Sequence, residues 1–178
     1  MPLHHQGKIF GVGLSRTGTL SLATALRLLG YHTIHYPFTM EEILQHDASV
    51  DISVSARFIY LSRLYPESKF ILTTRELDPW LASCEAHYAD PWRTDDPATW
   101  DSHKQAIAEN DFTIYGTWMY DKEMFIQAKQ RHESMVREWI PCDRLLEVNI
   151  TEDANVWSHI CRFLGFSEIP FPWEHKGC

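Results

Sequence analysis

A glycine-rich loop is the part of this sequence with the clearest chemical potential. It runs from Gly11 to Ser21 (GVGLSRTGTLS), after the apolar run 8–13 and before residues 19–29, which carry leucine and alanine at helical spacing. In such a strand–loop–helix unit, backbone N–H groups and the helix N-terminus bind phosphate-like anions. Arg16 adds a cation, and Thr17, Thr19 and Ser21 add hydroxyls. We therefore expect an anion-binding loop rather than a turn without a ligand.

Two familiar nucleotide-binding motifs do not fit this loop. The dinucleotide motif G-x-G-x-x-G fails because the third glycine, Gly18, comes too late after Gly11 and Gly13. A Walker A loop matches Gly13 and Gly18, but Thr19 stands at its lysine position and Leu20 at its metal-binding hydroxyl position. These two departures argue against nucleoside triphosphate hydrolysis of the usual kind.

The loop instead resembles the 5′-phosphosulfate loop of sulfotransferases. The residues that carry the resemblance are Arg16-Thr-Gly-Thr-x-Ser-Leu and Ala25-Leu-x-x-Leu-Gly30, and the compact group of the family with Arg-Thr-Gly-Thr is the most similar. These enzymes use 3′-phosphoadenosine 5′-phosphosulfate (PAPS) and release PAP. The resemblance implies that Arg16 takes the role of the loop lysine at the bridging oxygen and sulfonate. It also implies donor contacts from Ser15, Arg16, Thr17, Gly18, Thr19, Leu20 and Ser21.

A second block, Lys69 to Arg75 (KFILTTR) with Ser83 eight residues later, is similar to the part of sulfotransferases that holds the 3′-phosphate. A guanidinium fork matches phosphate oxygens, and a hydroxyl near a helix N-terminus adds donors. Lys176 stands in a His-Lys-Gly tail similar to the Arg-Lys-Gly that closes over this phosphate in larger members. The resemblance extends from about residue 8 to residue 172, through the blocks 144–148 and 161–165. It implies a P-loop-type fold.

The residue that accepts the proton of the acceptor is open at the level of sequence. Asp51 precedes a predicted helix at a place where the compact group carries an aspartate, and it suits equally well the N-cap of that helix. His32 and His35 are the alternatives, because other sulfotransferases use a histidine and these two follow a predicted strand.

Elements that alternate between strand and helix must position these residues. The patterns predict strands at 8–13, 31–36, 69–74 and 144–149, and helices at 19–29, 54–65, 121–139 and 154–164, with Pro79 near the start of one more. This alternation predicts an α/β fold whose central, mostly parallel sheet is flanked by helices. Residues 90–116 break the pattern. Their composition is typical either of a lid on the acceptor side, which would span residues 90–120, or of an additional helical segment packed on the core.

The chain length and the net charge argue against several classes of protein. The 178 residues suit one domain, 1–178, and 44% hydrophobic residues are enough for a core. The net charge of -8 argues against nucleic acid or an anionic membrane as the main partner. Apolar runs are too short to span a bilayer, the N-terminus lacks the apolar region of a signal peptide, and the four cysteines are scattered. We expect a cytoplasmic protein with reduced thiols.

The working hypothesis is a PAPS-dependent sulfotransferase that acts on a small-molecule acceptor without a metal ion. No His, Cys or Asp cluster has metal-ligand spacing. The acidic charge favours a neutral or cationic acceptor, and aromatic residues between 87 and 120 suggest a pocket for an apolar or aromatic one. They are Tyr88, Trp92, Trp100, Phe112, Tyr115 and Trp118. The alternatives are a P-loop kinase of a small metabolite and a non-catalytic nucleotide-binding protein.

Overall fold

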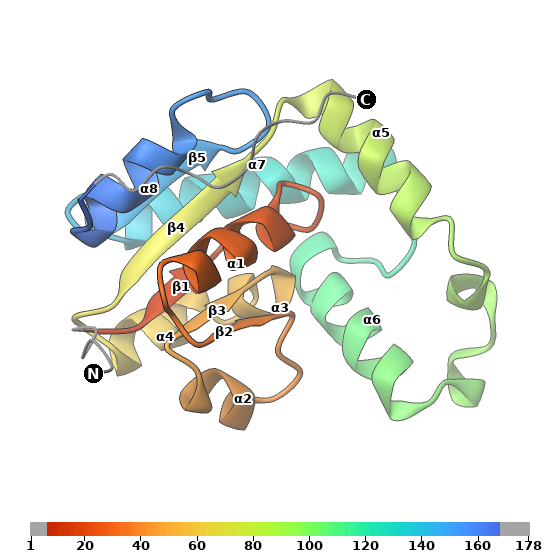
Figure 1. The fold of residues 1–178 in the computed structure, drawn as a ribbon. Coiled ribbons are helices and arrows are strands. Elements are labelled where there is room, and N and C mark those ends of the chain that lie inside the picture. The colour runs from red at the N-terminus through yellow and green to blue at the C-terminus, as the bar shows by residue number, and fades with distance from the viewer. Residues whose placement is uncertain (1–6, 168–178) are drawn as a thin grey trace.

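A five-stranded parallel β-sheet forms the centre of the computed structural model, which describes residues 7–167 (Figure 1). The strands lie in the order β2-β3-β1-β4-β5, and every neighbouring pair is parallel. Their bounds are β1 Ile9–Gly11, β2 Thr33–His35, β3 Ala48–Val50, β4 Lys69–Thr74 and β5 Leu145–Asn149. This sheet confirms the predicted α/β class. Because all strands are parallel, their carboxyl ends meet at one edge.

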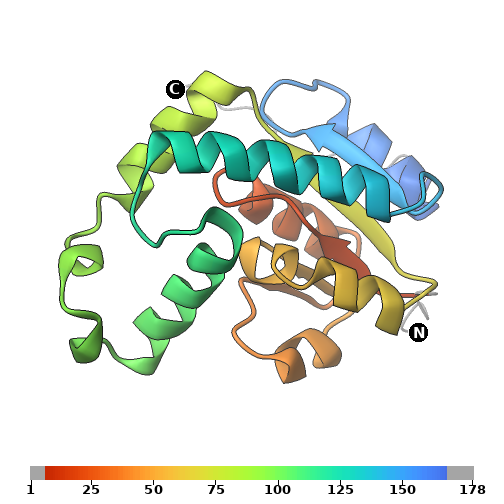
Figure 2. The same ribbon diagram turned by 180° about the vertical axis from the view of Figure 1, so that it is seen from behind.

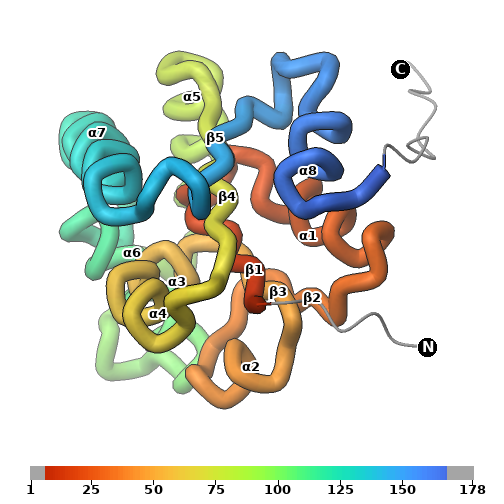
Figure 3. Tube along the Cα trace, turned by 90° about the vertical axis from the view of Figure 1, so that its left-hand side faces the viewer, coloured from red at the N-terminus to blue at the C-terminus, as the bar shows by residue number. Residues whose placement is uncertain are grey.

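Helices cover both faces of this sheet (Figures 1 and 2). On one face lie α1 (Thr19–Leu28) and α8 (Val156–Leu164), and on the other lie α3 (Ile52–Ser55), α4 (Phe58–Leu64) and α7 (Lys122–Trp139). The end-on trace in Figure 3 shows the two layers on either side of the strands. The remaining elements are α2 (Met40–Gln45), α5 (Leu77–Tyr88), α6 (Ser102–Tyr115) and two short 3₁₀ turns, η1 (Pro91–Thr94) and η2 (Pro97–Thr99).

Alternation of side chains along the strands divides the core in two. Ile9 and Ile71 pack with Leu22 and Leu26 of α1, whereas Phe10 and its neighbours pack against α4 and α7. Successive residues of a strand point to opposite faces, so a strand buried on both sides is apolar throughout. The apolar runs at 8–13 and 69–74 therefore mark two of the three inner strands of the sheet, β1 and β4.

Two parts of the fold differ from the sequence prediction. The single helix expected at 54–65 is broken into α3 and α4 around Arg57, whose φ of -121° leaves the helical region. The guanidinium of Arg57 donates to the carbonyl of Ser53 and to Asn110 on α6, and these contacts hold the break. Strand β3 and helix α2 have no counterpart in the prediction, because three and six residues are too few to show a periodic pattern.

The segment that breaks the sequence pattern lies beyond the carboxyl ends of the strands. It forms η1, η2 and α6, and α6 packs against α3 and α7 (Figure 1). A third cluster of buried side chains joins this region to the rest, with the rings of Tyr115 and Phe125 stacked at 4.0 Å. None of the helices in residues 7–167 combines the length and the apolar character needed to cross a bilayer.

Candidate active site

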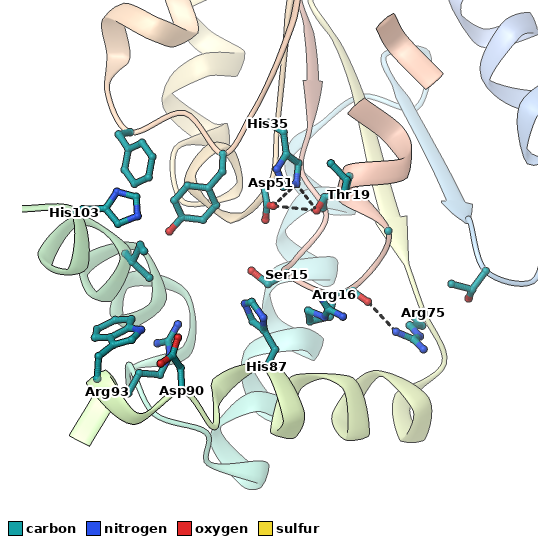
Figure 4. A pocket seen from close by; sticks show the side chains of 17 residues that line it. Ser15, Arg16, Thr19, His35, Asp51, Arg75, His87, Asp90, Arg93 and His103 are labelled. Carbon is teal, nitrogen blue, oxygen red and sulfur yellow. Dashed lines mark hydrogen bonds and ion pairs between the residues drawn. The ribbon is translucent and has the colours of Figure 1, made fainter. Parts of the chain in front are cut away.

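A cavity of about 590 Å³ opens at the carboxyl ends of the strands (Figure 4). Every strand contributes to its lining, at its last residue or in the segment that follows it: Arg16 after β1, His35 in β2, Asp51 after β3, Arg75 after β4 and Thr151 after β5. In an open parallel sheet, ligands bind outside these ends where neighbouring connections leave on opposite faces. Here β1 leads into α1 on one face and β3 leads into α3 on the other. The cavity therefore lies at the expected ligand position of the fold.

Backbone strain is concentrated in the same cavity. Three non-glycine residues in the described part of the chain have a left-handed φ: Arg16 at 71°, Tyr36 at 58° and Asp51 at 101°. All three line the cavity. Asp51 also has a ψ of 179°, a combination that is almost restricted to glycine. Such conformations cost free energy and cluster at binding and catalytic sites, which marks this cavity as the functional one.

The glycine loop is held rigidly by contacts within itself and to β4. A Cβ atom on Gly13 would lie 1.8 Å from Oγ1 of Thr73, so no larger residue fits there. The hydroxyl of Thr17 donates to the carbonyl of Leu14 and lies 2.7 Å from Oγ1 of Thr73. The indole N–H of Trp80 donates to the carbonyl of Ser15 at 2.9 Å. These contacts fix the path of the loop, and they turn the Thr17 hydroxyl into the protein rather than toward the cavity.

The N-terminus of α1 is suited to an anion. Its N-cap is Gly18, with a φ of 98° and no side chain that could cap the helix. The first N–H groups of a helix lack intrahelical partners, and the positive end of the helix dipole lies there. Gly18, Thr19 and Leu20 line the cavity at this point, where exposed Leu20 offers a backbone N–H and an apolar side chain.

Arg16, Arg75 and Ser83, which come from separate sequence blocks, lie together. Nε of Arg16 donates to Oγ of Ser83 at 3.0 Å, and Nη1 of Arg75 donates to the backbone carbonyl of Arg16 at 3.2 Å (Figure 4 shows the second contact). Strand β4 ends just before Arg75, and Ser83 lies on α5, which follows. The sheet thus brings two cations to the mouth of the loop. Burial raises the pKa of the neighbouring Cys84 to about 12, so its thiol stays neutral.

Asp51 is the centre of a hydrogen-bonded cluster. Its Oδ2 lies 2.6 Å from Nε2 of His35 and accepts a hydrogen bond from Thr19 at 3.0 Å, while its Oδ1 accepts from the N–H of Ile52 at 2.6 Å (Figure 4). Asp51 is therefore the N-cap of α3 and also part of the cavity wall. His32 lies elsewhere: its exposed ring stacks on His46 at 4.1 Å and does not line the cavity.

Three of the predicted donor contacts, Thr17, Ser21 and Ser83, are not part of the lining of this cavity. Ser21 is exposed on α1. Lys176 lies outside the described residues, so its predicted role stays a prediction. Among residues 7–167, no three His, Cys, Asp or Glu side chains are grouped so that they could hold a metal ion.

Comparison with known proteins agrees with this geometry. A sequence profile described as a sulfotransferase domain matches residues 8–47 and 39–177, which together span almost the whole chain. The chain belongs to the sulfotransferase family. It is also 25% identical, over an alignment of 216 positions, to "Ava biosynthesis cluster protein M" of Aspergillus versicolor, and the match covers 93% of this chain and 79% of that protein.

The far wall of the cavity in this sulfotransferase is formed by residues that the sequence motifs did not indicate. They come from the segment after β2, the end of α5, η1 and α6: Tyr36, Phe38, His87, Asp90, Arg93, His103 and Ile107. The local signal for them was only the aromatic content of residues 87–120. Trp92 from that set lines the cavity, whereas Tyr88, Trp100 and Tyr115 are buried in the core and Phe112 is exposed.

A buried ion pair supports this wall of the sulfotransferase. Nη1 of Arg93 lies 2.8 Å from Oδ2 of Asp111, and the hydroxyl of Tyr88 donates to Oδ1. Burial raises the pKa of Asp111 to about 6, although the Arg93 guanidinium opposes that shift. Burial and the charges of Arg16 and Arg93 lower the pKa of His87, which keeps its imidazole neutral at pH 7.

Proposed function

We propose that this sulfotransferase moves a sulfonate group from PAPS to a hydroxyl or amine of a small acceptor with an aromatic or apolar face. The observation that carries the proposal is the meeting of Arg16, Arg75 and Asp51 in one cavity. Two cations suit a donor with two separate anionic groups, and a carboxylate beside them suits an acceptor that must lose a proton.

The donor side is assigned to the glycine loop and the two arginines. The N–H groups at the start of α1 and the guanidinium of Arg16 hold the 5′-phosphosulfate, while Arg75 and Ser83 hold the 3′-phosphate. PAPS supplies a sulfonate that is already activated, so charge on its oxygens needs only fixed donors and no metal ion. Arg16 suits this task because its backbone and its Nε are both held by hydrogen bonds, which aligns the donor in advance.

Asp51 is assigned as the group that accepts the proton. Its carboxylate faces the cavity from the strand end next to the glycine loop, and its position is set by Thr19, Ile52 and the backbone strain. His35, whose Nε2 lies 2.6 Å from Oδ2 of Asp51, is the partner that holds the carboxylate in position. A base is effective when it is already within hydrogen-bond reach of the nucleophile, and this cluster keeps Asp51 in one place.

The acceptor side is assigned to the wall formed by residues 36–38 and by the segment 90–120. Rings of Phe38 and His103 lie 4.7 Å apart, those of Tyr36 and Phe38 lie 5.1 Å apart, and Trp92 lines the opposite part. Such walls favour a flat, apolar acceptor. A small-molecule acceptor, rather than nucleic acid or membrane, also fits the net charge of -8 and the biosynthesis cluster in the name of the fungal relative. The free thiols of Cys84 and Cys142 suit the cytoplasm.

Thermal unfolding with PAP tests the donor assignment. PAP without magnesium, at about 100 times its Kd, should raise the melting temperature by roughly 5–10 °C, because it binds only the folded chain. Arg16→Ala and Arg75→Ala should each abolish the rise, while Arg162→Ala on α8, remote from the cavity, should preserve it. A rise with ATP and magnesium in place of PAP would point to a kinase and refute the proposal.

Transfer itself is tested with PAPS labelled in its sulfonate group and a panel of phenols, aromatic alcohols and amines. We expect label in at least one aromatic acceptor and release of PAP in equal amount. PAP binding without transfer to any acceptor would favour a nucleotide-binding protein that does not catalyse.

A further inference from the structure

A second cavity lies between α4, α6 and α7, on the side of the sheet opposite α1. It has a volume of about 730 Å³ and shares no lining residue with the active-site cavity. Figure 2 shows the three helices that border it, with α7 passing across the top of the view. We call it the arginine groove. Its lining comprises Met40, residues 55–60, Arg63, Thr113, Ile114, Arg131, His132 and Met135.

Three arginines give this groove its charge. Among residues 7–167, Arg57, Arg63 and Arg131 line it, and no aspartate or glutamate does. None of the ion pairs found between described residues includes any of the three. In a chain with a net charge of -8, three cations without a carboxylate partner in one concave site are a marked local reversal of charge.

Neutral groups hold these guanidinium groups in place. Arg57 donates to the carbonyl of Ser53 and to Oδ1 of Asn110, and Arg131 donates to the carbonyl of Ile114 at 2.7 Å. Arg63 lies over the ring of Trp139, 5.1 Å from its centroid. Positioning by neutral partners leaves the positive charges uncompensated and orders the side chains before any ligand arrives. Both effects favour the binding of an anion.

Apolar side chains form the rest of the groove. Phe58, Ile59 and Ile114 line it, and Tyr60 and Met135 remain 58% and 39% exposed at its lip. A concave site of several hundred cubic ångströms with an apolar lining and a few fixed polar groups is typical of small-molecule binding. Inorganic phosphate or sulfate would leave the apolar surface uncovered, and a neutral hydrocarbon would leave the arginines unpaired.

We propose that the arginine groove is a second ligand site, which binds an amphipathic organic anion: a flat apolar body that carries a sulfonate, sulfate, phosphate or carboxylate group. The anionic group lies against Arg63 and Arg131, and the apolar body lies on Phe58, Tyr60 and Met135. The proposal does not rest on PAPS or on the assignments made for the active-site cavity, because different described residues line the two sites.

Titration of the full chain with naphthalene-2-sulfonate, followed by amide NMR, tests this site. The largest shifts should fall in residues 57–63 and 131–135. Naphthalene-2-sulfonamide, which has the same rings but no charge, should bind roughly tenfold more weakly, since a hydrogen bond to a charged group contributes more than one to a neutral group. Inorganic sulfate should also bind more weakly than the naphthalene-2-sulfonate anion.

Variants locate the anion within the groove. Arg63→Gln and Arg131→Gln should each weaken binding roughly threefold to tenfold, and Arg131→Lys should recover most of the loss. Arg162→Gln on α8 should bind like the wild type. Thermal unfolding of each variant shows that it is folded at the temperature of the titration.

Three results would overturn the proposal. They are equal affinity for the sulfonamide and the sulfonate, unchanged affinity in both glutamine variants, and largest shifts in residues 15–21, which would place the anion at the glycine loop. A separate measurement distinguishes these results from a failure of the proposed function. The rise in melting temperature with PAP should be the same in Arg131→Gln as in the wild type, because Arg131 does not line the active-site cavity.

Discussion

The active-site cavity has two walls that are built in different ways. On the wall at the strand ends, Arg16, Asp51 and Arg75 follow closely after β1, β3 and β4, and the first two have a strained backbone. The part of the far wall that comes from α5, η1 and α6 is here called the helical wall. In it, Arg93 and Asp111 are joined in a buried ion pair, and the backbone around them is regular. The first wall keeps its charges available to a ligand, whereas the second uses its charges to hold two segments together.

This difference between the walls predicts which substitutions change catalytic activity and which change the stability of the fold. Strain at a strand end lowers the stability of the fold and is retained only where the surrounding structure enforces it. A buried ion pair, once formed, is expensive to break, since the remaining charge has no partner and no water. We therefore expect substitutions at the strand ends to reduce turnover, and substitutions in the helical wall to reduce the free energy of unfolding.

The largest expected effect is that of Asp51→Asn on turnover. The amide cannot accept the proton at neutral pH, so kcat should fall by roughly 10² to 10⁴-fold. Asparagine is as good an N-cap as aspartate, so α3 should remain capped. Steady-state assays with labelled PAPS measure the change.

Binding of PAP supplies the control for this substitution. The affinity for PAP should be nearly unchanged in Asp51→Asn, because the donor groups are not altered. Turnover close to that of the wild type would remove Asp51 from the role of base and leave it as a cap only.

The helical wall should respond to Arg93→Ala with a loss of stability. Removal of one partner of a buried pair typically costs about 3–5 kcal/mol of unfolding free energy, because Asp111 is left without its cation. Urea unfolding measures the change. The matched control is Arg137→Ala, which removes an exposed guanidinium paired with Glu133 and Glu147 and should cost about 1 kcal/mol or less. Equal costs for the two substitutions would contradict the assigned role of the helical wall.

The smallest effect concerns the strain at Asp51. Asp51→Ala and Asp51→Gly both remove the carboxylate, but only glycine relieves the backbone at a φ of 101°. The glycine variant should therefore be more stable than the alanine variant by about 1–2 kcal/mol. Thermal or urea unfolding of the pair gives this difference directly.

An ordinary helical position provides the reference for that pair. Ala82 is exposed on α5, and Ala82→Gly should destabilise the protein by about 1 kcal/mol, which is the opposite sign for the same chemical change. If the alanine variant were more stable than the glycine variant at both positions, the backbone strain at Asp51 would not lower the free energy of unfolding.

Local sequence determined the glycine loop of this protein and the class of its fold. The apolar runs at 8–13 and 69–74 mark central strands, and the residues after them, Arg16 and Arg75, reach the ligand edge of the sheet because parallel strands end on the same side. These motifs are contiguous in the chain, so a strand, a loop and the start of a helix are enough to specify them. The same reasoning predicted the family, which the domain match confirms.

Only the tertiary structure decided which groups meet Asp51 and which residues face it across the cavity. The carboxylate was an open choice between cap and base, and the fold makes it a cap that also lies 2.6 Å from His35, while His32 lies outside the cavity. The short elements β3 and α2 bring Asp51 and His35 together, and neither element has a periodic sequence pattern. The helical wall and the arginine groove depend on packing between segments far apart in the chain, which no local pattern encodes.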